Sequence, residues 1–90
     1  MNPDPATIAL ELCTYLRERV LDKSVAVEPS TLFSDVGVDS MSVIELVMYL
    51  ERKHGIELPE TALQRKHLES AQALADCACA VRNGTFVSNP

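Results

Sequence analysis

The fold depends most on residues 32–55, which read LFSDVGVDSMSVIELVMYLERKHG. The first part places Gly37 within a run of turn-forming residues, and the second part is rich in apolar residues. Asp39 is a favourable N-cap because its carboxylate can accept hydrogen bonds from the free N–H groups of a first helical turn. Gly55 is typical of a helix end. We therefore predict a helix beginning at Asp39-Ser40, with an apolar face wide enough to be buried on more than one side.

Another helix is predicted before this stretch, from about Pro5 to Leu21. Asp4 can act as its N-cap, and Pro5 suits the first helical position, where an N–H group has no partner. Apolar residues then recur every four positions: Ile8, Leu12, Leu16 and Val20. Residues 22–38 form a long connection, which its own apolar side chains should pin to the core: Leu32, Phe33 and Val36.

The region after Gly55 predicts two more helices. Residues 60–67 suit a brief helix with Leu63, and with it Ala62, facing inward. Ser70 is an N-cap candidate for a final amphipathic helix that ends near Arg82. No alternating strand pattern occurs in the chain. We expect an all-α fold: a small four-helix bundle with a long loop between the first two helices and a short third helix.

Length and composition favour a carrier or binding module. The 90 residues leave room for one domain, which we expect to span 1–90 with an ordered core of about 5–82 and a flexible tail over 83–90. A domain of this size is too small to enclose the deep pocket that most enzymes use. Hydrophobic residues make up 47% and charged residues 23%, as in ordinary soluble domains.

Charge and aromatic content exclude several classes of partner. The net charge of −5 is the wrong sign for binding nucleic acid, and 4% aromatic residues without Trp provide no base-stacking platform. No apolar run approaches the roughly 20 residues needed to span a bilayer, so we expect no membrane insertion. The N-terminus lacks a signal-peptide pattern, and the chain holds three cysteines, an odd number. Both features favour the reducing cytoplasm.

Ser40 is the most informative polar residue. It stands at the first turn of a helix, directly after Asp39 and a Gly-containing turn. Free N–H groups and the positive end of the helix dipole favour a phosphate at such a position, and the Asp39 carboxylate suits a Mg²⁺-dependent phosphoryl transfer. The dipeptide alone is more often an ordinary helix cap than a modification site.

The wider pattern resembles the acyl carrier protein family over about Ile8 to Val81. The matching residues are Phe33, Asp35, Gly37, Asp39-Ser40, 43–48, Leu50-Glu51, 55–59, Leu68 and Ser70. In that family, the serine at the position of Ser40 receives 4′-phosphopantetheine from coenzyme A through a phosphopantetheinyl transferase. The thiol of this arm carries acyl groups as thioesters to acyl-transferring and condensing enzymes, and the carrier itself catalyses nothing.

The resemblance implies roles for individual residues. Ser40 is the expected attachment site, Asp39 its helper in recognition by the transferase, and Met41 a neighbour of the arm, together with Val43 or Ile44. Three acidic residues are candidates for docking to basic partners: Asp35, Glu45 and Glu51. No residue is expected to be catalytic or to bind a metal, and we expect a monomer.

Departures from the family pattern leave the pathway open. Ser42 stands where fatty-acid carriers usually have an acid, and Arg52 and Lys53 follow Glu51 where those carriers often continue with acids. Residues 31–60 still hold six acidic and two basic residues, so docking to basic patches should survive. Fatty-acid, polyketide and related specialised biosynthesis all remain candidate pathways.

A serine hydrolase is the first competing interpretation. It would need a histidine base beside Ser40. His54 lies about four turns further along the same helix, and the sequence does not place His67. The Gly-x-Ser-x-Gly pattern of a nucleophile elbow is missing.

A metal site built from cysteines and histidines is the second interpretation. Cys77 and Cys79 lie two residues apart on a helix, so their thiols point about 200° apart and would rarely share a metal. We expect one of them to be buried and the other to lie at the surface, with Cys13 in the core.

Two further interpretations involve no chemistry by the chain itself. The amphipathic helices suit an unmodified protein-interaction module equally well, and only Asp39-Ser40 and its flanking pattern separate it from a carrier. An aminoacyl or peptidyl carrier is the other, although the residues before Ser40 favour an acyl carrier.

Overall fold

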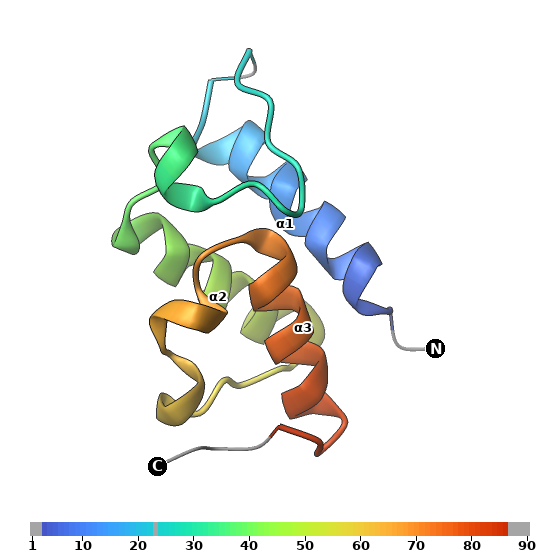
Figure 1. Ribbon diagram of the computed structural model, residues 1–90. Coiled ribbons are helices and arrows are strands. Elements are labelled where there is room, and N and C mark those ends of the chain that lie inside the picture. Colours follow the sequence, from blue (N-terminus) through green and yellow to red (C-terminus); the bar gives the residue numbers. More distant parts are fainter. Residues whose placement is uncertain (1–2, 23, 87–90) are drawn as a thin grey trace.

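The computed structural model describes residues 3–22 and 24–86. Within them the chain forms three α-helices, α1 (Pro5–Arg19), α2 (Ser40–His54) and α3 (Ala71–Arg82), and three single-turn 3₁₀ helices, η1 (Phe33–Val36), η2 (Glu60–Ala62) and η3 (Arg65–His67) (Figure 1). The described residues contain no strand, and their one β-bridge joins Leu32 to Ser70. The predicted all-α class is therefore confirmed.

The predicted count of four helices is not confirmed. The brief helix expected over residues 60–67 forms η2 and η3, which are separated by Leu63 and an extended Gln64. Turns of three residues suit the 3₁₀ geometry, and an α-helix this short would not repay the cost of its nucleation. Ala62 is buried as expected, but Leu63 is exposed.

The core lies where α1 packs against α3 and where α2 meets both. Its largest fully buried side chains come from all three helices: Ile8, Leu12, Leu16, Leu46, Leu50 and Leu74. The Asp4 carboxylate accepts a hydrogen bond from the Thr7 N–H at 2.8 Å, and α1 then ends at Arg19, two residues before the predicted Leu21. Among the helices that the structure describes, none combines the length and the apolar character that crossing a bilayer requires.

Helix α2 is buried on one side only, so the expectation of burial on more than one side was wrong. Val43, Leu46 and Leu50 face the core. Val47 and Tyr49 are partly buried against the same core. Three other apolar residues of α2 remain 73%, 41% and 51% exposed, respectively: Met41, Ile44 and Met48. Among the described residues no fourth α-helix packs on that side, and apolar side chains there contact solvent.

The long connection crosses the molecule and is tied to the start of α3. The Phe33 N–H donates to the Glu69 carbonyl at 2.8 Å, and the Gln72 N–H donates to the Pro29 carbonyl at 2.8 Å. Phe33 is buried and Val36 packs against the core, as predicted, but Leu32 is largely exposed. These bonds bring the residues before α2 next to the segment that follows η3.

All three cysteines are buried. Cys13 lies in the core as predicted, but the expectation that Cys77 or Cys79 would be at the surface was wrong. Cys79 belongs to the core, whereas Cys77 is covered by the residues around His67 and Phe86. Helix α3 is thus covered on two sides. Burial raises the pKa of each thiol.

Residues 83–86, the described part of the expected tail, fold back on α3. The N–H groups of Thr85 and Phe86 both donate to the carbonyl of Ala80, and the Phe86 ring meets the His67 ring edge-on at 5.6 Å. The rest of that tail, residues 87–90, lies outside the described residues.

Candidate functional site

The start of α2 exposes Ser40 to solvent. Gly37 adopts a left-handed conformation with φ of 76°, a value that favours glycine, and so turns the chain out of η1. Val38 is then buried, which anchors the backbone just before the helix. Ser40 follows as the first residue of α2, with its side chain exposed. The predicted position of the hydroxyl, unburied at the entrance of this helix, is confirmed.

Asp39 closes the first turn of α2. Its carboxylate accepts a hydrogen bond from the Ser42 N–H at 2.9 Å, and its carbonyl accepts one from the Val43 N–H at 3.1 Å. The hydrogen bond from the Ser42 N–H holds the pKa of the Asp39 carboxyl below its usual range. Asp39 therefore presents a fixed negative charge directly before Ser40.

A cleft of about 570 Å³ adjoins Ser40. It lies between η1, the first turns of α2 and the segment from η3 to α3. Its lining residues are Leu32, Phe33, Ser34, Val38, Asp39, Ser40, Val43, Ile44, Arg65, Leu68 and Glu69. The cleft thus combines an apolar surface with two carboxylates and one guanidinium group.

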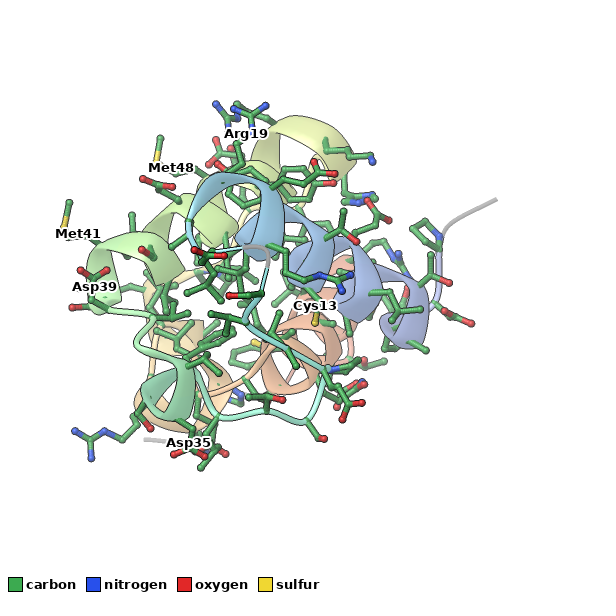
Figure 2. All side chains as sticks on the ribbon, turned by 90° about the horizontal axis from the view of Figure 1, so that it is seen from above. Cys13, Arg19, Asp35, Asp39, Met41 and Met48 are labelled. Carbon is green, nitrogen blue, oxygen red and sulfur yellow. The ribbon has the colours of Figure 1, made fainter. Side chains whose placement is uncertain are left out.

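The structure separates the predicted neighbours of the arm. Val43 and Ile44 line the cleft beside Ser40, but Met41 does not. In Figure 2, Met41 and Asp39 lie at the same edge of the molecule, with Met41 pointing outward, and Asp35 lies apart from both. Met41 is therefore close to Ser40 in sequence but turned away from the cleft.

Comparison with known proteins decides the family. Residues 11–78 match the profile of the family described as the phosphopantetheine attachment site. The chain belongs to this family. Proteins of this phosphopantetheine-binding family carry 4′-phosphopantetheine as a covalent group.

Several curated relatives are named acyl carrier protein. The protein of Campylobacter hominis is 47% identical over 36 residues, which cover 40% of this chain and 46% of the relative. The protein of Helicobacter pylori is 37% identical over 56 residues, or 61% of this chain and 72% of the relative. That of Zymomonas mobilis is 38% identical over 39 residues, or 43% and 50%. The chain spans about half the length of the first of these relatives.

The residues at the start of α2 suit the group that this phosphopantetheine-binding family carries. An exposed hydroxyl at a helix N-terminus can form a phosphate ester whose charge meets the positive end of the helix dipole. Arg65, the one basic residue lining the cleft, adds a guanidinium group on the same side as Ser40. The apolar walls of the cleft suit the uncharged part of the arm.

Sequence reasoning did not single out Arg65 or Glu69, and it named Leu68 only as part of the family pattern. These residues lie too far from Ser40 in the sequence for a single helix or hairpin to bring them next to it. Their position depends on the hydrogen bond between the Phe33 N–H and the Glu69 carbonyl, a contact between segments distant in the sequence. The only available signal was the basic run of residues 65–67.

The three predicted docking residues do not form one patch. Asp35 lies on η1, and Glu45 and Glu51 lie on α2, all with exposed side chains. Glu45 and Glu51 are six residues apart on α2. Six residues turn an α-helix through one full circle and about 240° more, so the two side chains point in different directions. A partner would meet these carboxylates on separate faces.

The arrangement provides no histidine base for Ser40 within the described residues. His54 lies at the far end of α2, where its Nε2 atom is 3.2 Å from Glu11 Oε1. His67 lies on η3, contacts Phe86 and lines a different cleft. In the part of the chain that the structure describes, no group of three His, Cys, Asp or Glu residues is placed to hold a metal ion.

Proposed function

We propose that Ser40 carries a 4′-phosphopantetheine arm and that the chain is an acyl carrier. The exposed Ser40 hydroxyl at the capped start of α2 supports this proposal most directly. The match to the phosphopantetheine attachment family and the names of the curated relatives support it independently. The domain would be a single carrier unit with a core of about 5–82.

Loading would proceed by attack of Ser40 Oγ on the phosphorus atom next to the pantetheine part of coenzyme A. The new Oγ–phosphorus ester bond would form as the bond to the nucleotide part breaks, and the transferase would accept the hydroxyl proton. Asp39 would face the transferase as a carboxylate at the attachment point. The arm's thiol, with a pKa of about 8.5, would then hold the acyl group as a thioester, which loses its thiolate far more readily than an oxygen ester loses its alkoxide.

The cleft beside Ser40 would hold the first part of the arm. Val43, Ile44 and Leu68 provide apolar contacts for it, and Arg65 provides a donor for the phosphate. Met41, which points away from the cleft, would instead face the enzyme that handles the arm, as one residue of the exposed side of α2.

The remaining parts of the proposal concern the cellular role. The chain would perform no chemistry itself and would work as a monomer in the cytoplasm. Its partners would be a phosphopantetheinyl transferase and the acyl-transferring and condensing enzymes of fatty-acid, polyketide or related specialised biosynthesis. Exposed carboxylates at Asp35, Glu45 and Glu51 would dock to basic patches on these enzymes.

Intact-mass analysis tests the attachment site. The chain is incubated with coenzyme A, Mg²⁺ and a broad-specificity transferase, and we expect a mass increase of one phosphopantetheine group. Ser40→Ala should remain unmodified with an unchanged circular dichroism spectrum. Ser34→Ala is the matched control, because Ser34 is also exposed and lines the same cleft, and it should be modified normally.

The same experiment separates the alternatives. An unmodified interaction module would show no mass increase in any variant. Modification of Ser40→Ala to the same extent would show that another residue carries the arm. Loading of the modified chain with an amino acid, and not with acyl groups, would identify an aminoacyl or peptidyl carrier.

A further inference from the structure

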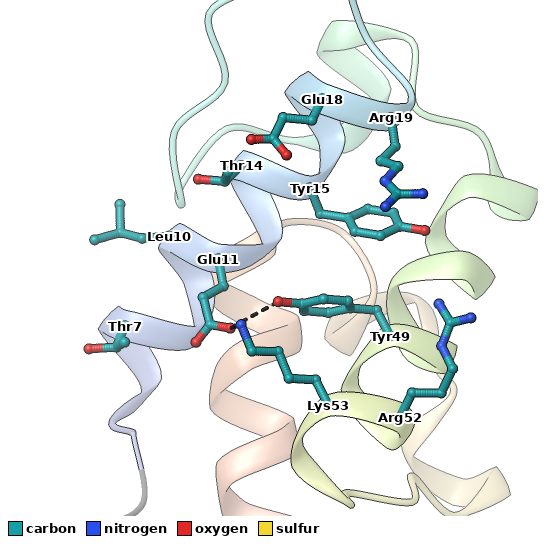
Figure 3. Close-up of a pocket in the computed structure, with 10 residues that line it drawn as sticks. All are labelled: Thr7, Leu10, Glu11, Thr14, Tyr15, Glu18, Arg19, Tyr49, Arg52 and Lys53. Atoms are coloured by element: carbon teal, nitrogen blue, oxygen red, sulfur yellow. Dashed lines mark hydrogen bonds and ion pairs between the residues drawn. The ribbon is translucent and has the colours of Figure 1, made fainter.

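A groove lies between α1 and α2, away from Ser40. It consists of two adjoining clefts of about 680 and 400 Å³, which share Tyr15, Arg19 and Arg52; we call it the α1–α2 groove. The larger cleft is drawn in Figure 3 and also includes Tyr49. Arg52 lies twelve residues after Ser40 on α2, about 18 Å along the helix axis. The α1–α2 groove is therefore separate from the proposed attachment site.

The floor of the larger cleft is a closed polar network. Glu11 Oε1 accepts a hydrogen bond from the Tyr49 hydroxyl at 2.9 Å, forms an ion pair with Lys53 Nζ at 2.9 Å, and lies 3.2 Å from His54 Nε2. Figure 3 shows Glu11 reaching from α1 to Tyr49 and Lys53 on α2. These contacts all meet at Glu11 Oε1, whereas the Lys53 side chain remains more than half exposed to solvent.

The wall of the α1–α2 groove is aromatic. The rings of Tyr15 and Tyr49 lie 5.1 Å apart with a tilt of 46° between them. The Arg19 guanidinium lies 5.7 Å from the centre of the Tyr15 ring, and Lys53 Nζ lies 5.7 Å from that of Tyr49. These are the only two tyrosines of the chain. Their flat, partly polar surfaces are typical of protein contact sites.

Two guanidinium groups converge on this wall. In Figure 3, Arg19 from α1 and Arg52 from α2 point toward the same space beside Tyr15. Glu18 lines the larger cleft and Glu45 the smaller one, but within the described residues neither arginine has a carboxylate within ion-pair distance. Two like charges held near each other are best stabilised by an anion between them, and the planar guanidinium fork matches a carboxylate.

We propose that the α1–α2 groove is a docking surface for an acidic segment of a partner protein. One carboxylate of that segment binds between Arg19 and Arg52, and a neighbouring apolar side chain packs on Tyr15 and on the exposed Met48 of the smaller cleft. Tyr, Arg and Met are enriched in protein–protein interfaces. The net charge of −5 repels every anionic partner at long range, so binding of the acidic segment depends on short-range contacts with Arg19 and Arg52.

This surface adds a second mode of contact to the proposed function, and it is opposite in sign to docking by Glu45 and Glu51. The two modes meet at Glu45, which lines the smaller cleft with Arg19 and Arg52. A carboxylate on the chain at that position competes with a carboxylate from a partner. Removal of the Glu45 charge should therefore strengthen binding of an acidic segment, whereas it should weaken docking to a basic patch.

A titration followed by NMR tests the proposal. A blocked peptide of alternating Glu and Leu is added to the full chain labelled with ¹³C and ¹⁵N, and its Gln and Leu counterpart is the matched probe. We expect the acidic peptide alone to shift the Nε–H signals of Arg19 and Arg52 and the ring signals of Tyr15 and Tyr49. Binding should weaken as salt rises, and Ser40→Ala should bind equally, so failure of the attachment proposal would leave this result unaffected.

Substitutions of single residues and of the arginine pair identify which side chains bind the acidic peptide. Arg19→Gln combined with Arg52→Gln should raise Kd by at least about tenfold, because both charge-assisted contacts are lost. Arg17→Gln removes one positive charge, half of the change in the double variant, from an exposed position of α1 outside the groove, and should change Kd less than about twofold. Glu45→Gln should lower Kd. All variants must first show the dispersed amide spectrum of the folded chain. If the double variant does not fold, the comparison of Kd between wild type and Glu45→Gln tests the proposal by itself.

Several results would overturn the proposal. Equal shifts with the Gln peptide would show that the carboxylates are not recognised. A loss of affinity in Arg17→Gln as large as in the double variant would reduce the effect to net charge. The same shifts on addition of inorganic phosphate alone would indicate a site for small anions, and the same shifts on raising protein concentration without peptide would indicate that a second copy covers the groove.

Discussion

Glu11 joins α1 to α2 through a single oxygen atom, and its removal is the sharpest test of how these helices are held. Glu11→Ala deletes the acceptor of the Tyr49 hydroxyl, the partner of Lys53 and the neighbour of His54 in one step. Glu11→Gln keeps an oxygen that can accept from Tyr49 but removes the charge. Comparing the two variants separates the hydrogen bond from the ion pair.

The loss of stability expected for Glu11→Ala follows from how exposed each partner of Glu11 is. The partly buried hydrogen bond from the Tyr49 hydroxyl contributes about 1 kcal/mol, the typical net value for an intramolecular hydrogen bond, because solvent reaches the Glu11 carboxylate. His54 is mostly buried and would lose its polar contact, which adds about 0.5 kcal/mol. Lys53 is more than half exposed, so solvent screens its pair and it adds little. Glu11→Ala should therefore lower the free energy of unfolding by about 1.5 kcal/mol and Tm by about 6–12 °C.

The effect should depend on pH in a defined direction. Burial, the largest single influence, raises the pKa of Glu11, but hydrogen bonds from Lys53, Tyr49 and His54 together outweigh it and hold this pKa below its ordinary value of 4.5. A carboxyl whose pKa is lower in the folded state stabilises the fold above the unfolded-state pKa. That contribution is lost as the pH falls through the folded-state pKa. The gap in unfolding free energy between wild type and Glu11→Ala should thus be full at pH 7 and shrink as the pH falls below the ordinary glutamate pKa of 4.5.

Urea unfolding followed by circular dichroism at a series of pH values measures this gap. Glu18→Ala is the matched control, because Glu18 is an exposed glutamate of the same helix with no ion pair among the described residues, and it should stay within about 0.5 kcal/mol of wild type. The reasoning is refuted if Glu11→Ala costs no more than Glu18→Ala at pH 7. It is equally refuted if the gap is the same at low pH.

Further predictions concern the helix ends, the core and the thiols. Gly55→Ala should lower the free energy of unfolding by about 1–2 kcal/mol, because the φ of 66° at this position strains a residue with a side chain. No atom lies near the added methyl group, so backbone strain is the whole cost, and unchanged urea unfolding would contradict this. Leu46→Ala, at a fully buried position, should cost about 2–5 kcal/mol in the same assay, and a smaller loss would mean that the core is loosely packed. Asp39→Asn should keep the thermal midpoint because Asn also caps helices, whereas Asp39→Ala should lower it; equal midpoints would show that the cap is dispensable. The three buried cysteines, whose pKa is raised, should react with iodoacetamide far more slowly in the native chain than in urea, and a fast native adduct in intact-mass analysis would reveal an exposed thiol.

Part of the site could be predicted because it depends on neighbouring residues. Asp39, Ser40 and Gly55 act within one or two turns of the backbone they cap or begin. Their roles follow from local hydrogen bonds and dihedral angles, which the sequence specifies directly. The first helix was predicted to end at Leu21 but ends at Arg19, two residues earlier. Helix ends fray, and no strong stop signal follows Arg19 in the sequence.

The other part depended on packing between distant segments. The exposure of Met41 and Met48 could not be seen in an apolar pattern, because a wide stripe is buried only where other elements cover it. The apolar pattern also did not show that residues 85–86 fold back on α3 and line one cleft with Cys77. The residues 60–67 looked helical but were too short to hold an α-helix against the competing turns.

The sequence by itself determined where α2 begins, which hydroxyl stands at its entrance and to which family the pattern belongs. Only the tertiary structure decided that Arg65 and Ser40 line the same cleft, that Met41 points away from it, and that Arg19 and Arg52 converge between two helices. The physical reason is the range of the interactions. Capping and backbone conformation act over a few residues, whereas the placement of one side chain against another helix depends on how the whole core packs.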